Sequence, residues 1–352
     1  MKTRTAIVSV LAIALFAWFL SHADLGVAWT HVRNARVDLL VVGFVCVWAT
    51  YWARAVRWQY LLAPVGPTRF RTAFRTTVIG FAALGLLPAR AGDLLRPYLL
   101  ARQEGLDPTA TFATVVMERV LDLVAVLVLL ALYVWVFAEA GTLPAHLLRP
   151  IEASAALAAA AAVGLLALMW VLASHPERIG GLVLSVGGVL PRHIAGRLAR
   201  LAIAFSSGFA AARDVRTVAW AVVWSFPVWL AIAFEAWAVT AAFAIDMPVT
   251  GAFLLQALLV IGVAVPTPGA VGSYHEAYRF GVTTFFGAAN DRAVAAAIVV
   301  HALSFIPVVL VGIVFMAQDG LSIGRLKQMA GEAREKEIPH TDEVPILRPS
   351  GR

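Results

Sequence analysis

The sequence predicts an all-α polytopic membrane protein with about six full transmembrane helices and two re-entrant helical hairpins. The first observation is composition: 61% of the 352 residues are hydrophobic and 14% are charged, with a mean hydropathy of +0.82. A soluble domain averages about 25% charged residues. The second observation is a set of apolar segments that reach the roughly 20 residues a helix needs to cross the hydrocarbon. The third is a pair of shorter apolar runs that break at proline and glycine.

The first apolar segment follows Lys2 and Arg4 and could be mistaken for a signal peptide. The residues after it, 21–24, match a small-residue cleavage site poorly, so we expect an uncleaved first helix. The predicted spans are residues 5–22, 38–60, 111–138, 151–173, 217–244 and 292–317.

The two shorter runs are interpreted as descending limbs of re-entrant hairpins. Residues 76–88 and 251–265 would descend, and residues 92–106 and 270–288 would return. A bilayer accepts broken helices and charges only where protein or a water-filled cavity surrounds them, so these breaks indicate a transport path. The residues expected at the hairpin tips are Pro88, Gly92, Pro266, Pro268, Gly269 and Gly272.

Charge placement sets the expected orientation. With both termini in the cytoplasm, five arginines fall on the outer side and the rest of the 28 Lys and Arg fall on the inner side, as the positive-inside rule expects. The outer arginines are Arg33, Arg36, Arg149, Arg279 and Arg292. This arrangement makes residues 1–138 and 151–317 a possible inverted-topology repeat, a common transporter architecture. A short echo, Pro88-x-x-x-Gly92 and Pro268-x-x-x-Gly272, supports the repeat, although chance remains an alternative.

Two regions outside the spans are assigned by composition. Residues 177–213 are basic with helical spacing of apolar residues, which predicts an amphipathic helix on the inner leaflet. Residues 318–352 form a charged cytoplasmic tail. The net charge of +7 is attributed to membrane orientation, because no soluble basic domain is present to bind nucleic acid.

The strongest group of chemistry-bearing residues is Glu118-Arg119-x-x-Asp122 in the third span. On a helix, Glu118 and Asp122 share a face, and ionisable groups at membrane depth are costly unless paired or hydrated. The expected partners are Arg90 and Arg96 of the first hairpin, with Asp93 close to both. Two interpretations stay open: an ion-pair network that holds the hairpin, or a polar cavity whose arginines bind a lipid phosphate.

Further polar residues are secondary candidates. Arg54 and Arg57-Trp58 are typical of an interfacial anchor, which is favoured over a binding role. Glu276 is expected either to pair with Arg279 or to take a proton or cation during transport. The others are Glu235, His275 and His301, and for His301 a helix-to-helix hydrogen bond is favoured.

The motifs resemble a known family. Arg54-x-x-Arg57-Trp58, the stretch from Pro88 to Arg96, and Pro266-x-Pro268-Gly269 followed by Glu276 are similar to the flippase-like membrane domain of lysylphosphatidylglycerol synthases. The resemblance covers about residues 5–317. Ala270 stands where the family usually has a second glycine, which puts the substrate in doubt.

The resemblance implies a multi-pass protein of the plasma (bacterial inner) membrane that moves a polar lipid between leaflets. Some members carry a soluble aminoacyltransferase domain, which we do not expect in the 35 or so residues after the last span, so lipid aminoacylation is not expected. The sequence lacks a phosphate loop, metal-ligand spacing and a Gly-x-Ser-x-Gly motif, so no enzyme activity, cofactor or metal is predicted.

We therefore expect residues 1–317 to form a flippase-like domain for a polar or anionic lipid (a glyco-, phospho- or isoprenoid lipid). The alternative is an accessory or scaffold protein for a lipid-modifying enzyme, with no transport of its own. An intramembrane transferase is a third interpretation, for which no donor site is identified. The predicted substrate-binding residues are Arg90, Asp93, Arg96, Glu118, Arg119, Asp122 and Glu276.

Overall fold

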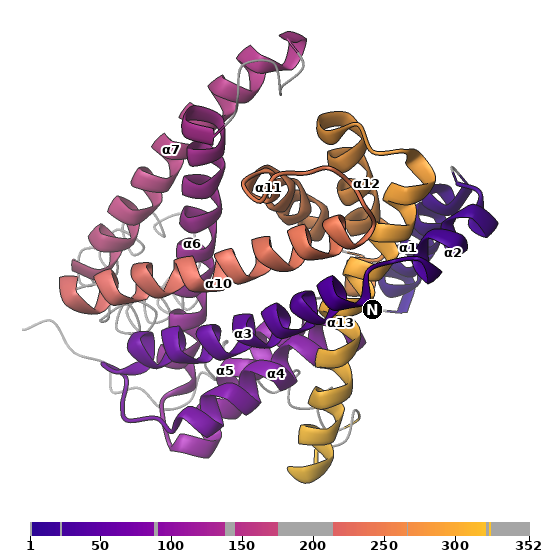
Figure 1. Cartoon of the computed structure of the whole chain (residues 1–352). Coiled ribbons are helices and arrows are strands. Elements are labelled where there is room, and N and C mark those ends of the chain that lie inside the picture. The colour runs from indigo at the N-terminus through magenta and orange to yellow at the C-terminus, as the bar shows by residue number, and fades with distance from the viewer. Residues whose placement is uncertain are drawn as a thin grey trace, which may run out of the picture.

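The computed structural model describes residues 2–21, 23–87, 91–137, 145–174, 214–265, 267–321 and 324, and in these residues the chain is helical without strands. The predicted all-α class is therefore confirmed for this part of the chain. In order, the elements are α1 (Lys2–Ser21), α2 (Leu25–Arg33), α3 (Val37–Leu62), α4 (Phe70–Leu86), α5 (Ala91–Glu104), α6 (Pro108–Leu132), η1 (Tyr133–Phe137), α7 (Ala145–Ser174), α10 (Val215–Ala242), α11 (Gly251–Ala264), η4 (Pro268–Ala270), α12 (Ser273–Phe286) and α13 (Asn290–Gln318) (Figure 1).

Three described helices are long and apolar enough to cross a membrane: α3, α10 and α13. They match the predicted spans at 38–60, 217–244 and 292–317. A fourth span is possible if the bent pair Ile13–Ser21 and Leu25–Arg33 counts as one. α6 is 25 residues long but carries three charged residues in its middle. The chain is thus a multi-pass membrane protein with three to four clearly apolar spans, and the predicted total of six stays a prediction.

Helix α2 was not expected from the sequence. It turns away from the end of α1 by 86°. The Asp24 carboxylate accepts hydrogen bonds from the backbone N–H groups of Gly26 and Val27, which caps the new helix. The Asp24 N–H donates to the Asp291 carboxylate at 3.1 Å, and α2 packs against α13. A local cap and a long-range contact therefore end the first apolar segment and start a separate helix.

The limbs of each predicted hairpin form a packed helix pair, while the re-entrant course stays a prediction. α4 packs against α5, and α11 packs against α12. At Gly92 an added Cβ would lie 2.0 Å from the Gly80 carbonyl oxygen, and at Gly262 it would lie 2.9 Å from the Ser273 carbonyl oxygen. Only glycine allows such close approach of the two limbs. The first limb, α4, begins at Phe70, earlier than predicted, because its apolar positions continue through a first turn that also contains polar residues.

The hairpin tips are described in part. Gly269 and Gly272 have φ values of +61° and +86°, which explains glycine at both positions of the second tip. Pro268 begins η4. Pro88, Arg90 and Pro266 lie outside the described residues, as do the amphipathic segment 177–213 and almost all of the predicted tail.

The centre of the molecule is built where the two hairpins meet the long helices. α3 and α10 run side by side across the molecule, and α13 packs against α4 (Figure 1). α4 also contacts η4, so the first hairpin touches the tip of the second. α6 contacts α3, α5, α10 and α11. Side chains from both halves of the chain can therefore meet around α6.

Candidate functional site

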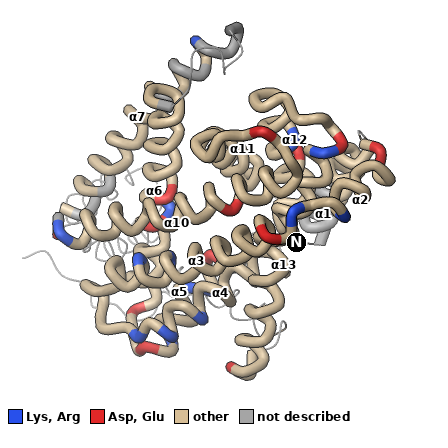
Figure 2. The backbone as a smooth tube through the Cα atoms, viewed as in Figure 1, with Lys and Arg blue, Asp and Glu red and all other residues tan. Residues whose placement is uncertain are grey.

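An arginine–carboxylate cluster surrounds the middle of α6. Glu118 accepts a hydrogen bond from Arg96 Nη1 at 2.9 Å and lies 3.0 Å from Arg57 Nη2. Asp122, one turn further on, accepts from Arg57 Nη1 at 2.8 Å and from Arg54 Nη1 at 3.2 Å. Figure 2 shows acidic and basic residues side by side where α6 passes α10. The predicted shared face of Glu118 and Asp122 is confirmed, and it brings together arginines of α3 and α5.

One half of the cluster is fully enclosed. The side chains of Arg57, Arg96 and Glu118 are 0%, 2% and 0% exposed. The Arg96 guanidinium lies over the Trp58 ring at 3.8 Å, and Arg57 donates to Ser225 Oγ at 3.0 Å. These side chains contact one another and the neighbouring helices in the interior of the protein. They fix α3, α5, α6 and α10 to one another, as in the ion-pair interpretation of the sequence.

The other half of the cluster is open. Arg119 donates to Asp93 at 2.7 Å and to Asp122 at 3.4 Å, and its side chain is 35% exposed. Trp229 of α10 donates its indole N–H to Asp122 at 2.9 Å. Asp93 of α5 therefore faces α6, where it pairs with Arg119. The expected grouping of Asp93 with Arg90 and Arg96 stays a prediction, because Arg90 lies outside the described residues.

The described cluster carries more positive than negative charge. Four arginines face three carboxylates in it. The members are Arg54, Arg57, Arg96 and Arg119 with Asp93, Glu118 and Asp122. A surplus of one positive charge is costly at membrane depth unless an anion or water compensates it. The open half is where such an anion can reach the cluster.

A cavity of about 670 Å³ adjoins this open half. Arg54, Arg119 and Asp122 line one part of it. Both hairpins contribute walls, Leu84 and Leu87 from the first and residues 263–265, 267, 269 and 270 from the second. Most of the remaining lining is aliphatic or aromatic, with a second group of polar residues: Thr50, Tyr51, Glu235, Gln256, Thr267, Tyr274 and Ser304.

Comparison with known proteins matches the chain to a family. The model of the family described as the lysylphosphatidylglycerol synthase TM region covers residues 6–312. The chain belongs to this family. A relative among curated proteins is "Glycosyltransferase AglD" of Haloferax volcanii, which is 29% identical over 122 residues. That match covers 34% of this chain and 19% of AglD, so the chain spans under a fifth of that relative.

In this lysylphosphatidylglycerol synthase TM region, two arginines of α3 do not lie where the favoured interpretation of the sequence placed them. Arg54 and Arg57 were interpreted as interfacial anchors, but they are 6% and 0% exposed and bind the carboxylates of α6. They are central to the cluster because α3 crosses α6 at this point. Arg54 also lies over the Phe81 ring of α4, 5.1 Å from its centroid.

The second hairpin residues lie apart from the cluster. Glu276 pairs with Arg279, as the three-residue spacing predicted, and Arg279 also donates to the Asn290 side chain at 3.0 Å. Glu276 is not among the described residues that line the cavity. His301 makes the predicted hydrogen bond to a neighbouring element, the Gly269 carbonyl, at 2.8 Å. His275 is buried and accepts from the Gly272 N–H, which fixes the start of α12.

Sequence reasoning missed several residues of the site. Trp229, Ser225 and Phe81 gave no signal, because a tryptophan, a serine or a phenylalanine within an apolar helix is ordinary in a membrane protein. Gln256 did give a signal: it is the polar side chain within the apolar α11. Its position on the cavity wall could have been suspected from the same argument that singled out Glu235.

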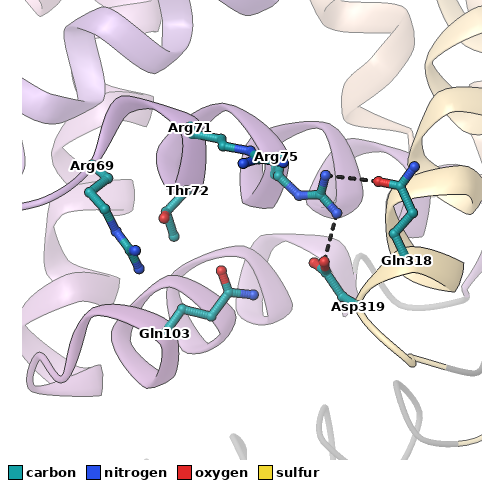
Figure 3. Close-up of a pocket in the computed structure, with 7 residues that line it drawn as sticks. All are labelled: Arg69, Arg71, Thr72, Arg75, Gln103, Gln318 and Asp319. Atoms are coloured by element: carbon teal, nitrogen blue, oxygen red, sulfur yellow. Dashed lines mark hydrogen bonds and ion pairs between the residues drawn. The ribbon is translucent and has the colours of Figure 1, made fainter.

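A second, more polar pocket lies at the beginning of α4. It has a volume of about 350 Å³ and is lined by residues of α4, α5 and the end of α13: Arg69, Arg71, Thr72, Arg75, Gln103, Gln318 and Asp319. Figure 3 shows Arg75 reaching from α4 to Gln318 and Asp319, at 2.9 and 2.6 Å. Arg75 also lies over the Phe315 ring at 4.5 Å. These contacts hold the end of α13 against the beginning of α4. The cluster contacts α4 at another position, Phe81.

Proposed function

We propose that this chain is a flippase-like transporter that moves a polar or anionic lipid between the leaflets of the plasma membrane. The observation that carries the proposal is the cavity of about 670 Å³, which joins a positively charged cluster to apolar walls. A membrane lipid has the same two parts, an anionic phosphate and hydrocarbon chains. No chemical step is part of the proposal.

The open arginines would hold the phosphate. Arginine donates several hydrogen bonds in a fixed planar arrangement that fits phosphate oxygens. Arg119 is 35% exposed in its side chain and Arg54 lies beside it on the cavity wall. Asp93 and Asp122 would keep these guanidinium groups in place between transport events. Arg57, Arg96 and Glu118 would support this arrangement from the enclosed half.

The hairpins would provide the moving parts. In the proposal both are re-entrant and the two halves of the chain form an inverted repeat, so their tips meet near the midplane. Support comes from the contact between α4 and η4 and from the residues that both hairpins give to the cavity. Left-handed glycines at the second tip, Gly269 and Gly272, allow sharp backbone turns there. Rocking at such a contact opens a central site to one side at a time.

A liposome assay tests the proposal. The purified protein is reconstituted with a fluorescent anionic phospholipid, and movement between leaflets is followed by chemical quenching of the outer leaflet. Arg119→Ala removes a charge-assisted hydrogen-bond donor worth about 1.5–3 kcal/mol, so the transport rate should fall at least about tenfold. The matched control is Arg69→Ala, because Arg69 is 73% exposed and lies outside the cavity. Equal rates for wild type and Arg119→Ala would refute the site.

A second candidate function is an accessory protein for an enzyme that modifies lipids or glycolipids. The enclosed ion pairs of Arg57, Arg96 and Glu118 favour it, since they connect helices to one another in the protein interior. The partial match to a protein named as a glycosyltransferase also suits a partner in such a pathway. An absence of lipid movement in the wild-type liposomes, with the protein correctly folded, would favour this alternative.

A further inference from the structure

The cavity has a second polar region whose chemistry differs from that of the arginine cluster. Gln256 of α11 is 1% exposed, and neither its amide nitrogen nor its amide oxygen has a hydrogen-bond partner among the described residues. The residue lines the cavity. A buried amide without partners costs about 1–3 kcal/mol for each unmet group. A side chain retained at this cost on a cavity wall is expected to serve a ligand.

Glu235 of α10 lines the same cavity. It is 5% exposed and accepts a short hydrogen bond from the Ser304 hydroxyl of α13. No Arg, Lys or His side chain pairs with it in the part of the chain that the structure describes. Glu235 and Ser304 both line the cavity, so three helices contribute a carboxyl, a hydroxyl and an amide to its wall.

The distance between the two polar regions can be estimated along α10, which contributes a residue to each. Trp229 contacts Asp122 of the cluster, and Glu235 lies six residues further along the same helix. At 1.5 Å per residue this is about 9 Å along the helix axis. The other lining residues of α11 include Leu259, Val260 and Val263, which are apolar. The cavity thus offers a cationic site and a neutral hydrogen-bonding site that one headgroup can reach together.

We propose that Gln256, Glu235 and Ser304 form a subsite for a neutral hydroxylated headgroup, a glycerol or a sugar, on the lipid whose phosphate Arg54 and Arg119 hold. This inference rests on the proposed function and specifies its substrate class. Hydroxyl groups both donate and accept, which matches an amide that needs both kinds of partner. A second phosphate, when fully ionised, only accepts hydrogen bonds and would leave the amide oxygen of Gln256 unsatisfied. An ammonium group only donates and would leave the amide nitrogen of Gln256 unsatisfied.

Lipid binding by native mass spectrometry tests the subsite. The full-length protein is titrated with phosphatidylglycerol, with phosphatidic acid, which lacks a headgroup alcohol, and with phosphatidylethanolamine. We expect wild type to prefer phosphatidylglycerol over the other two. Gln256→Leu should weaken phosphatidylglycerol binding about fivefold or more, for the loss of one or two hydrogen bonds, and change phosphatidic acid binding less than twofold. It should also raise the thermal unfolding temperature, because two unsatisfied buried groups are gone.

A second variant guards against a misfolded Gln256→Leu protein. Ser304→Ala should also weaken phosphatidylglycerol selectively, since it frees Glu235 from its fixed orientation. A preference of wild type for phosphatidylethanolamine, or equal losses for all three lipids in both variants, would overturn the subsite. Such results would leave the transport rate and its dependence on Arg119 unaffected, so failure of the subsite and failure of the proposed function are separate outcomes.

Discussion

Removing the charge of Glu118 should destabilise the fold more than any other single change in the cluster. The Glu118 side chain is 0% exposed and lies within 3.0 Å of Arg57 and Arg96. In Glu118→Gln, Arg57 keeps Asp122 and Ser225 as partners, but Arg96 loses the one carboxylate that it contacts among the described residues and keeps the face of Trp58 and a neutral amide oxygen. An arginine left buried without a counter-charge costs about 3–5 kcal/mol. We expect the free energy of unfolding to fall by that amount.

The reverse change should cost less. Arg96→Met leaves Glu118 with Arg57 and Arg54, and methionine can pack on the ring of Trp58. The double variant removes both partners, so it should recover about 2–3 kcal/mol relative to the sum of the single losses.

Equilibrium unfolding in mixed detergent micelles measures all four proteins of this cycle. Tryptophan fluorescence follows the transition. A loss below about 1 kcal/mol in Glu118→Gln would refute the argument that Arg96 depends on this carboxylate. So would a double variant whose loss equals the sum of the two single losses, because coupled partners are not additive.

Two further predictions concern helix contacts and use the same unfolding measurement. Gly92→Ala places a Cβ 2.0 Å from the Gly80 carbonyl oxygen and should lower the free energy of unfolding by about 3 kcal/mol or more. The control is Gly164→Ala, which has nothing within 4 Å of the added Cβ and should be neutral or slightly stabilising. Similar losses of stability in both variants would contradict the close packing of α4 on α5. Arg75→Ala breaks the partly exposed pair with Asp319 and should cost about 1 kcal/mol, and this loss should shrink at high salt; a loss insensitive to salt would mean that packing on α13 dominates.

The helical elements and the first pair of the cluster could be predicted because their signals are local. Apolar length predicts α3, α10 and α13, and proline with glycine at a break predicts the two helix pairs. The four-residue spacing of Glu118 and Asp122 places both on one face of α6 whatever the tertiary fold. Charge balance at membrane depth then requires a cation nearby, which identified Arg96.

The remaining parts of the site depend on how distant helices cross, which no local pattern encodes. Arginine beside tryptophan near the end of an apolar segment is equally typical of an interfacial anchor and of a buried pair. Only the crossing of α3 with α6 and α10 decides that Arg57 is buried. Asp93 likewise has two arginines within three residues of its own helix, and only the packing of α5 on α6 shows that Arg119 also binds it. The total number of spans and the re-entrant course of the hairpins stay predictions.

Helix α10 links the two polar regions of the cavity to the enclosed part of the cluster. Ser225 contacts Arg57, Trp229 contacts Asp122 and Glu235 contacts Ser304 of α13. A shift of α10 along α3 therefore changes the partners of Asp122 and the position of the Glu235 carboxyl at the same time. In the proposed transport cycle, this coupling would make a lipid that engages both regions favour one position of α10. A phosphate without a headgroup alcohol would engage only the first region and would bias that equilibrium less.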